Sequence, residues 1–311
     1  GATVGWTPSS DIVNALEPTP PQTQKAIFGY GDTGSVVSMT NLVNSSGVVA
    51  SDTTGVGTAR SLLGATSYGL DKAIFAYGWS AGALSMSNLV SNSGVVASDV
   101  SGVGTARRGL GASGYGYDKA IFAYGYDDST PYLSTSNLVS SSGVIATDTT
   151  GVGTARADIA ATGYGGDKAI MGYASNASGE SSITNLISNS GVVASDVTGV
   201  GTARYNAEGA TYGGDKGIFA YGYDNSSNLS ISNLVSNTGI VSTDVTGVGT
   251  VRRGLGANGY GGDKAIFGYG ITSGAVSMTN LVNNSGVIAS DVSGVGTGRY
   301  LLAACGYSIS A

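Results

Sequence analysis

The feature that most constrains this chain is that it repeats itself six times. The string Lys-(Ala/Gly)-Ile-(Phe/Met) returns at intervals of 47 to 49 residues. A period of roughly 20 to 50 residues is typical of solenoids, propellers and related arrays, in which each unit packs against its neighbours. A length of 311 residues fits one large domain or two ordinary ones, so the repeat has to decide the architecture. The six lysines are Lys25, Lys72, Lys119, Lys168, Lys216 and Lys264.

Two further markers show where the units differ in length. One is the Asn of the Asn-Leu-(Val/Ile) step, first at Asn41, and the other is the Arg that closes each Gly-Val-Gly-Thr-x-Arg segment, first at Arg60. Asn and Arg are 19 residues apart in every unit, and each Arg is followed by the next Lys after 12 residues. The distance from Lys to Asn varies between 16 and 18 residues. All length variation therefore falls in one loop.

Each unit is predicted to form short strands. In the second unit they cover Lys72 to Tyr77, Leu84 to Val90, Val95 to Asp99 and about Ala106 to Tyr115. The chain has 52 glycines and is rich in Ser, Thr and Val, a composition that favours strands and tight turns over long helices. The apolar runs do not alternate with polar residues, as expected where both faces of a sheet are covered.

Four strands in about 48 residues predict an all-β fold, a six-bladed β-propeller with four-stranded blades that covers residues 25–311. The chain enters at Lys25 without a preceding Arg strand and ends with a spare one from Gly296 to Ile309. We expect this C-terminal strand to complete the first blade. Residues 1–24 break the repeat and hold four of the five prolines, which suggests an arm or linker. An open β-solenoid is the alternative, although its rungs are usually shorter.

The composition excludes large classes of chemistry. The chain has no histidine and a single cysteine, Cys305, so His-ligated metal sites, His-based catalysis and an internal disulfide are excluded. No apolar run approaches the roughly 18 residues of a membrane-spanning helix, and no signal peptide is visible at the start. We predict no catalytic residue, no metal, no cofactor and no membrane insertion.

Most charges belong to the repeat. Twelve of the 14 basic residues are the Lys and Arg markers, and eleven aspartates recur beside them. We expect ion pairs and capped turns between or within blades; a ring of charges around a central channel is the alternative. The charged residues outside the repeated positions are nine acids and two bases, Arg108 and Arg253. This acidic surplus argues against nucleic acid as a partner, because phosphates demand clustered basic residues.

The loop of variable length carries the candidate ligand-binding residues. Its aromatic rings, carboxylates and amides suit a sugar, which offers apolar faces for stacking and hydroxyls for hydrogen bonds; polar loops that vary without function are the alternative. A second variable patch follows the Arg marker (Arg108, Asp158, Tyr205, Asn206, Arg253 and Tyr300) and is expected to fill blade edges. The candidate residues are Trp79, Tyr126, Asp127, Asp128, Tyr132, Asn176, Glu180, Tyr223, Asp224 and Asn225.

The repeated sequence motifs resemble those of two known kinds of repeat protein. The order of an Arg, a small-residue strand, a glycine turn and an Ile-Phe-x-Tyr-Gly strand resembles the kelch-type blade without its paired glycines and Trp. The tandem Asp-Lys-Ala-Ile-Phe-x-Tyr-Gly, Thr-Asn-Leu-Val and Gly-Val-Gly-Thr-Ala-Arg resembles repeat proteins of tailed bacteriophages that are assigned to virions or tail fibres. This resemblance implies a particle-attached adhesin. Kelch-like copper oxidases need histidines, so their chemistry does not carry over.

Three functions are therefore open. The first is a non-enzymatic virion or extracellular-surface module that recognises a host-surface glycan or protein through the variable loops. The second is a purely structural subunit that joins other virion or surface subunits through the N-terminal arm. The third is a polysaccharide-degrading enzyme, for which Asp127, Asp128 and Asp224 are the conceivable acids.

Overall fold

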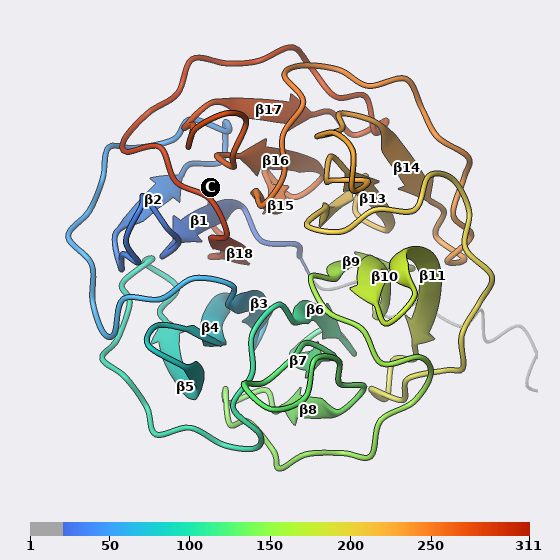
Figure 1. Ribbon diagram of the computed structural model, residues 1–311. Helices are drawn as coiled ribbons and strands as arrows, with labels where there is room; N and C mark the ends of the chain where they lie inside the picture. Colours follow the sequence, from blue (N-terminus) through green and yellow to red (C-terminus); the bar gives the residue numbers. More distant parts are fainter. Residues whose placement is uncertain (1–20) are drawn as a thin grey trace, which may run out of the picture.

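The computed structural model describes residues 21–311, and residues 1–20 of the predicted arm lie outside this part. Within it the chain is all-β, without a helix, and forms six antiparallel sheets of three strands each (Figure 1). No helix that could cross a membrane is found in this part of the chain. By sheet, the strands are β18 (Ala303–Tyr307), β1 (Lys25–Gly29) and β2 (Thr40–Val43); β3 (Gly64–Tyr68), β4 (Lys72–Trp79) and β5 (Ala83–Val90); β6 (Gly111–Tyr115), β7 (Lys119–Ala123) and β8 (Ser136–Val139); β9 (Ala160–Tyr164), β10 (Lys168–Asn176) and β11 (Gly179–Ile187); β12 (Glu208–Tyr212), β13 (Lys216–Ala220) and β14 (Ser232–Val235); β15 (Gly256–Tyr260), β16 (Lys264–Gly268) and β17 (Thr279–Val282).

The first sheet takes one of its strands from the end of the chain. β18 pairs antiparallel with β1, from Lys25 opposite Tyr307 to Gly29 opposite Ala303. In every other sheet the equivalent strand comes directly before its partner in the sequence, as β3 precedes β4. The prediction that a C-terminal strand completes the first sheet is confirmed.

The prediction of four strands per unit is wrong, because the expected strand from Val95 to Asp99 pairs only through isolated bridges, and the same holds in the other units. The side chain of Asn88 donates to the carbonyl of Ala97 (2.9 Å), which takes the place of a backbone partner. Val95 is also 64% exposed, so no other part of the described chain covers this outer edge of the sheet and keeps it in a regular strand. Each unit thus has three strands and an outer segment that is only loosely paired.

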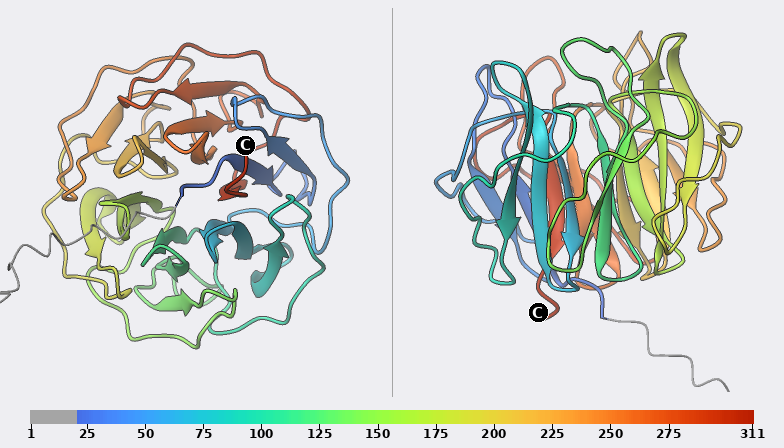
Figure 2. Two further views of the ribbon diagram at one scale, coloured as in Figure 1. Left: turned by 180° about the vertical axis from the view of Figure 1, so that it is seen from behind. Right: turned by 90° about the horizontal axis from the view of Figure 1, so that it is seen from below.

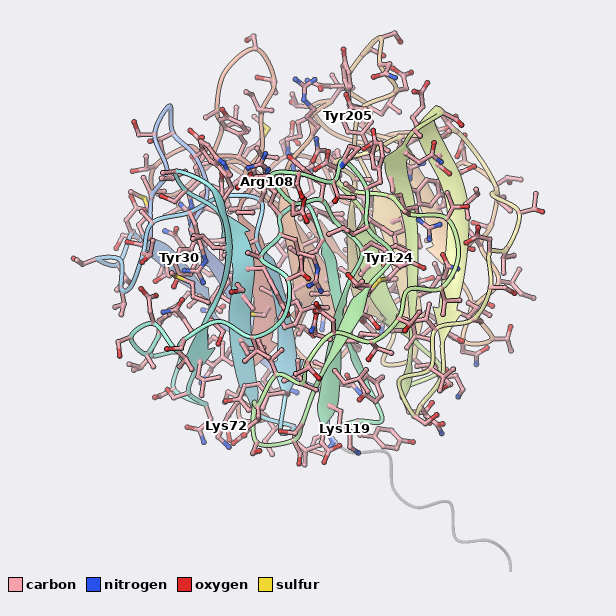
Figure 3. The ribbon with its side chains drawn as sticks, turned by 60° about the horizontal axis from the view of Figure 1, so that its bottom comes forward. Tyr30, Lys72, Arg108, Lys119, Tyr124 and Tyr205 are labelled. Atoms are coloured by element: carbon pink, nitrogen blue, oxygen red, sulfur yellow. The ribbon has the colours of Figure 1, made fainter. Side chains whose placement is uncertain are left out.

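The six sheets lie around a common centre (Figures 1 and 2). The strand nearest the centre in each sheet contacts its counterparts in the two neighbouring sheets, and β18 contacts both β3 and β15. The described chain begins and ends at one end of the sheets, which we call the terminal face (Figure 2). The opposite end, the variable-loop face, carries the loops 79–83, 126–132 and 223–228; in Figure 3, Arg108 and Tyr205 lie toward it and Lys72 and Lys119 toward the terminal face.

Two cycles of backbone hydrogen bonds link the sheets; the first returns to the residue where it starts, and the second returns to the turn where it starts. At the variable-loop face the N–H of each member donates to the carbonyl of the next at 2.7 to 3.1 Å. We call these six residues the axial ring: Leu62, Leu301, Gly254, Asn206, Asp158 and Gly109. At the terminal face an equivalent cycle joins the turns, for example from Gly69 N–H to Asp118 O (2.8 Å) and from Ser308 N–H to Asp71 O (2.8 Å).

The core lies between the sheets. Tyr30 and Phe75, from neighbouring sheets, meet edge to face with their centroids 5.1 Å apart, and Tyr77 and Phe122 repeat the contact at 5.4 Å. Because each sheet is covered on both faces, strands such as Ala73 to Tyr77 are buried throughout. This confirms the interpretation of the non-alternating apolar runs.

Candidate functional site

The repeated charges are structural. Arg107 is fully buried; its guanidinium lies 4.3 Å from the ring centroid of Tyr77 in one sheet, and its Nε donates to the carbonyl of Tyr124 in the next (3.0 Å). Its Nη1 is 3.9 Å from Oδ1 of Asp148. Each marker arginine therefore bridges two sheets, which confirms the expected ion pairs. The six arginine–tyrosine stacks are Arg60 on Tyr30, Arg107 on Tyr77, Arg156 on Tyr124, Arg204 on Tyr173, Arg252 on Tyr221 and Arg299 on Tyr269.

The aspartate of this arrangement explains the Gly-Val-Gly-Thr segment. Asp148 accepts hydrogen bonds from the hydroxyl and the N–H of Thr105 (2.6 and 3.0 Å) and from the side chain of Asn137 (2.9 Å). Gly104 has φ +74°, and a Cβ there would overlap the Asp148 carboxylate. Burial would raise the pKa of Asp148, but these hydrogen bonds and the charge of Arg107 outweigh it and lower the pKa. The Gly-Val-Gly-Thr segment therefore binds the aspartate carboxylate of the next unit.

With these groups assigned to the scaffold, two groups of side chains that the repeat does not require lie on the variable-loop face. The first group, the Arg108 cluster, joins two sheets. The guanidinium of Arg108 lies 4.7 Å from the ring centroid of Tyr126 and 5.7 Å from that of Trp79, and it pairs with Asp128 at 3.0 Å. Asp128 also accepts the N–H of Ala83 (2.8 Å). Arg108 thus lies over rings that come from two neighbouring sheets.

The second group, the Tyr223 cluster, has the same components. Arg253 lies 4.2 Å from the ring centroid of Tyr223, and Tyr205 meets Tyr223 edge to face at 5.7 Å. The hydroxyl of Tyr205 donates to Oδ1 of Asn225 (3.2 Å), whose amide in turn donates to Glu180. Three predicted site residues, Glu180, Tyr223 and Asn225, thus lie together. Tyr205 and Arg253, which were expected only to fill blade edges, belong to the same cluster.

Asp158, a member of the axial ring, was not among the predicted site residues. Its Oδ1 is buried without a hydrogen-bond partner among the described residues. A Cβ on Gly109 would come within 2.6 Å of this oxygen, so the carboxyl fits because position 109 is glycine. Burial raises the pKa of Asp158 to about 6, although the charge of Arg108 opposes the shift. The sequence could have indicated Asp158, because it is an acid at a position where the other five units have Leu, Gly or Asn.

The remaining predicted residues do not join these clusters. Asp127 accepts the N–H of Ser129 (2.7 Å), Asp224 accepts that of Ser227 (2.8 Å), and Asn176 accepts that of Ser178 (2.8 Å), so all three cap their own turns. Tyr132 is half-buried, and among the described residues neither Arg108 nor Arg253 stacks on its ring. The prediction separates into two clusters and a set of turn residues.

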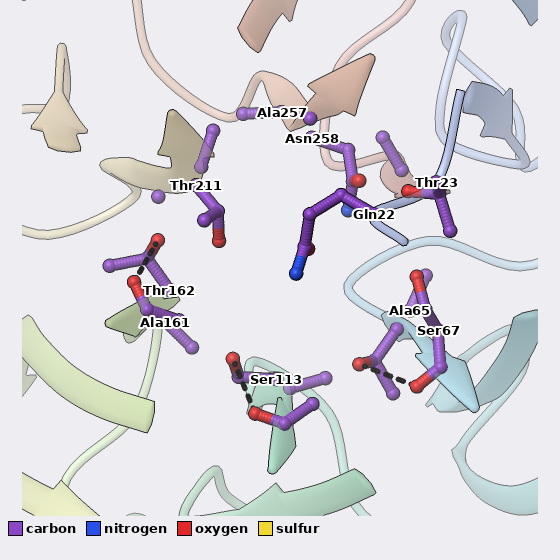
Figure 4. A pocket seen from close by; sticks show the side chains of 18 of the residues that line it. Gln22, Thr23, Ala65, Ser67, Ser113, Ala161, Thr162, Thr211, Ala257 and Asn258 are labelled. Carbon is purple, nitrogen blue, oxygen red and sulfur yellow. Dashed lines mark hydrogen bonds between the residues drawn. The ribbon is translucent and has the colours of Figure 1, made fainter. Parts of the chain in front are cut away.

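A cavity of about 170 Å³ lies at the centre of the six sheets (Figure 4). It extends from below the axial ring to the turns of the terminal face, where Gln22 and Thr23 border it. None of the marker arginines or their partner aspartates lines it, so the alternative of a ring of these charges around the channel is wrong. Its wall carries the small polar residues Ser67, Ser113, Thr162, Thr211 and Asn258, together with Glu208.

Among residues 21–311, no three His, Cys, Asp or Glu side chains are grouped so that they could hold a metal ion. Comparison with models of protein families and with curated proteins finds no match for this chain.

Proposed function

We propose that this protein is a non-enzymatic recognition module that binds a surface glycan through its variable-loop face. The observation that carries the proposal is the placement of the Arg108 and Tyr223 clusters. Both consist of side chains that the sixfold scaffold does not need, and both lie on the face opposite the two ends of the described chain. Loops on a rigid scaffold are where binding residues concentrate.

We also infer that the six sheets form a closed six-bladed β-propeller. The contacts among the strands nearest the centre run from each sheet to the next and include β15 to β18 and β18 to β3. The two cycles of backbone hydrogen bonds and the pairing of β18 with β1 support the same conclusion. Closure gives the variable loops a rigid base, since no sheet is left without a neighbour.

The chemistry of the clusters favours a sugar. Trp79, Tyr126 and Tyr223 are half-buried, so part of each ring remains accessible. An arginine packed against each of these rings fixes its orientation, which lowers the entropy lost when a sugar stacks on it. The carboxylates of Asp128 and Glu180 accept hydrogen bonds and would take those of sugar hydroxyls. A host-surface protein remains the second ligand class.

The turn roles of Asp127 and Asp224 support a non-enzymatic function. The hydroxyl of Ser226 and the N–H of Ser227 lower the pKa of Asp224. At Asp127 burial has the opposite effect, but the N–H groups of Thr130 and Ser129 outweigh it and lower the pKa. Neither carboxyl is suited to donate a proton near neutral pH, which the general acid of a glycosidase must do.

The opposite face suits attachment. Both ends of the described chain lie at the terminal face, and the predicted Pro-containing arm precedes residue 25 in the sequence. We propose that the arm joins the module to other subunits of a virion or extracellular structure, in keeping with the resemblance to bacteriophage repeat proteins. The variable loops would then point away from the particle.

A glycan array tests the proposed site. The purified chain is applied to bacterial surface polysaccharides and their oligosaccharides, and the assay is repeated with Trp79→Ala and Tyr223→Ala. The control is Ile309→Ala, a change of an exposed side chain near the end of the chain. We expect binding that both loop variants reduce at least about tenfold and the control leaves intact, because a stacked aromatic is worth roughly 1–2 kcal/mol. Glycan binding that survives both loop substitutions would refute the site.

A further inference from the structure

The wall of the axial cavity departs from sixfold symmetry at one ionisable residue. Glu208 occupies the first position of β12, the strand of its sheet nearest the centre. The same position in the other five units holds only glycine or alanine: Gly64, Gly111, Ala160, Gly256 and Ala303. The fold therefore does not require a carboxyl at this position.

Glu208 lies where two cavities meet. It lines the axial cavity and also a smaller pocket of about 30 Å³ that the axial-ring residues line as well. Burial raises the pKa of Glu208 to about 8, opposed only by a hydrogen bond from the N–H of Gly209. No other side chain of the described residues hydrogen-bonds to it or forms an ion pair with it. A carboxyl of this kind is an unused acceptor facing a polar cavity.

Three hydroxyls of the wall also present acceptors to the cavity. The hydroxyl of Ser67 donates to the carbonyl of Gly306 (2.8 Å). Those of Ser113 and Thr162 lean toward the carbonyls of Gly114 and Gly163 at 3.5 and 3.4 Å (Figure 4). A hydroxyl has one proton, so an oxygen that donates to a carbonyl offers only lone pairs to a ligand. The cavity thus favours a ligand that donates hydrogen bonds.

The charges around the cavity leave Glu208 without a counterion. Lys168 and Lys264 line its mouth, but each pairs with its preceding aspartate, at 2.7 and 2.9 Å. The strands packed against β12, which are β9, β13, β15 and β16, add only lysines at their terminal-face ends and the phenols of Tyr164 and Tyr260. Asp158, the other carboxyl near the axis, lines the smaller pocket.

We propose that the axial cavity is a binding site for a small organic ammonium ion, with the carboxylate of Glu208 as its counterion. One carboxylate balances one positive charge, and the described residues offer no group of acids for a multivalent metal ion. A cavity of about 170 Å³ is close to the roughly 150 Å³ that holds a benzene molecule, so a ligand of about six to eight non-hydrogen atoms fits. Gln22 and Thr23 border the cavity (Figure 4), and we expect the ligand to enter past them from the terminal face.

Binding requires that Glu208 lose its proton. In the free protein the carboxyl is mostly protonated at pH 7, and an ammonium ion binds the carboxylate form. The proton passes to the solvent as the ion pair forms. Affinity must therefore rise with pH until Glu208 is ionised without ligand, at about pH 8.

Isothermal titration calorimetry of the whole chain tests this site. The probe is ethanolamine, and ethylene glycol is its neutral counterpart. We expect saturable binding of ethanolamine, none of ethylene glycol, and release of nearly one proton per site at pH 6.5, measured in two buffers of different ionisation enthalpy. Glu208→Gln and Glu208→Ala should each weaken binding at least about tenfold, since a charge-assisted hydrogen bond is lost.

The controls separate the site from other effects. Glu208→Ala introduces the residue that Ala160 and Ala303 provide in other units, so it should fold, which thermal melting verifies. Asp32→Asn removes a carboxylate that caps its own turn (Gly34 N–H to Oδ1, 2.7 Å) and should leave binding intact. Equal binding of ethylene glycol, or unchanged binding by folded Glu208→Gln, would overturn the proposal. So would complete competition by potassium chloride, which would indicate an inorganic cation site.

Discussion

Nη1 of Arg299 lies 3.8 Å from Oδ1 of Asp52, across a separation of almost the whole described chain. The same guanidinium donates to the carbonyl of Tyr30 (2.9 Å) and lies 4.3 Å from the ring centroid of Tyr269. These contacts match those that Arg107 makes within the chain's interior. The junction between the last and the first sheet thus has the same chemistry as the others.

Substitution of Arg299 should be costly. Arg299→Ala leaves the Asn41 and Tyr30 acceptors and Asp52 without their partner, and breaking a buried pair costs roughly 3–5 kcal/mol. The half-exposed pair of Arg108 with Asp128 should contribute only about 0–1 kcal/mol. Urea unfolding of Arg299→Ala and Arg108→Ala measures the difference. Equal losses of unfolding free energy would contradict the structural role of the marker arginines.

The six aspartates that lie beside these arginines, five of them as ion pairs, should make the fold sensitive to acid. At Asp52 burial acts to raise the pKa, but hydrogen bonds from Thr297 and Asn41 and the charge of Arg299 lower it below its ordinary value of 3.8. The folded protein therefore keeps the carboxyl ionised at a pH where the unfolded chain binds a proton. This stabilisation is complete above about pH 4 and is lost as the pH falls through the folded-state pKa. The urea concentration at the unfolding midpoint should fall as the pH is lowered from 5 to 2. Asp52→Asn should make this fall less steep, because one of the titrating carboxyls is gone. An equally steep fall in the parent and in Asp52→Asn would contradict the role of Asp52.

Glu208 should have the opposite effect at higher pH. Its pKa rises from 4.5 to about 8 on folding, so the folded protein holds a proton that the unfolded chain has released. Stability should then fall as the pH rises from about 4.5 to 8, by on the order of 1 kcal/mol per pH unit. Glu208→Ala should flatten this dependence and be more stable than the parent at pH 8. Differential scanning calorimetry at pH 5, 6.5 and 8 gives the comparison, and identical profiles would refute the assignment.

Two glycines of the last unit provide a matched test of packing. A Cβ on Gly294 would overlap Oγ of Ser277, whereas a Cβ on Gly274 meets nothing within 4 Å. Gly294→Ala should therefore destabilise the protein by roughly 1–3 kcal/mol, and Gly274→Ala should change it by less than about 0.5 kcal/mol. Thermal unfolding of the two variants distinguishes them. A loss at Gly274 as large as at Gly294 would contradict the assignment of the effect to overlap with Ser277.

The all-β class, the unit boundaries and the completion of the first sheet by β18 were predictable from the sequence, because the repeat makes the missing strand visible by comparison. The outer segments were mispredicted as strands. Val95 to Asp99 has a strand-like composition, but the side chain of Asn88 competes with backbone pairing, and no pattern of apolar residues reveals that competition.

The site was predicted only in part. The variable loop led to Trp79, Tyr126, Asp128, Glu180, Tyr223 and Asn225. The arginines that hold the rings were interpreted as edge residues, and Arg108 does pair with Tyr126 through its backbone. That their side chains stack on these rings depends on how neighbouring sheets are placed, which one unit's sequence does not encode. In the sequence, Glu208 is only one of the nine acids outside the repeated positions. Its place beside the axis depends on how all six sheets are arranged, which the sequence of one unit does not reveal.

The sequence repeat and the sheet are offset by one strand. A stretch from one marker lysine to the next contains two strands of its own sheet and the first strand of the following one, as Lys72 to Asp118 contains β4, β5 and β6. Precise loss of such a stretch from the gene would leave β3 beside β7, its equivalent partner, so every surviving sheet would keep three strands. Unequal recombination between repeats would thus change how many sheets the protein has and leave each one whole.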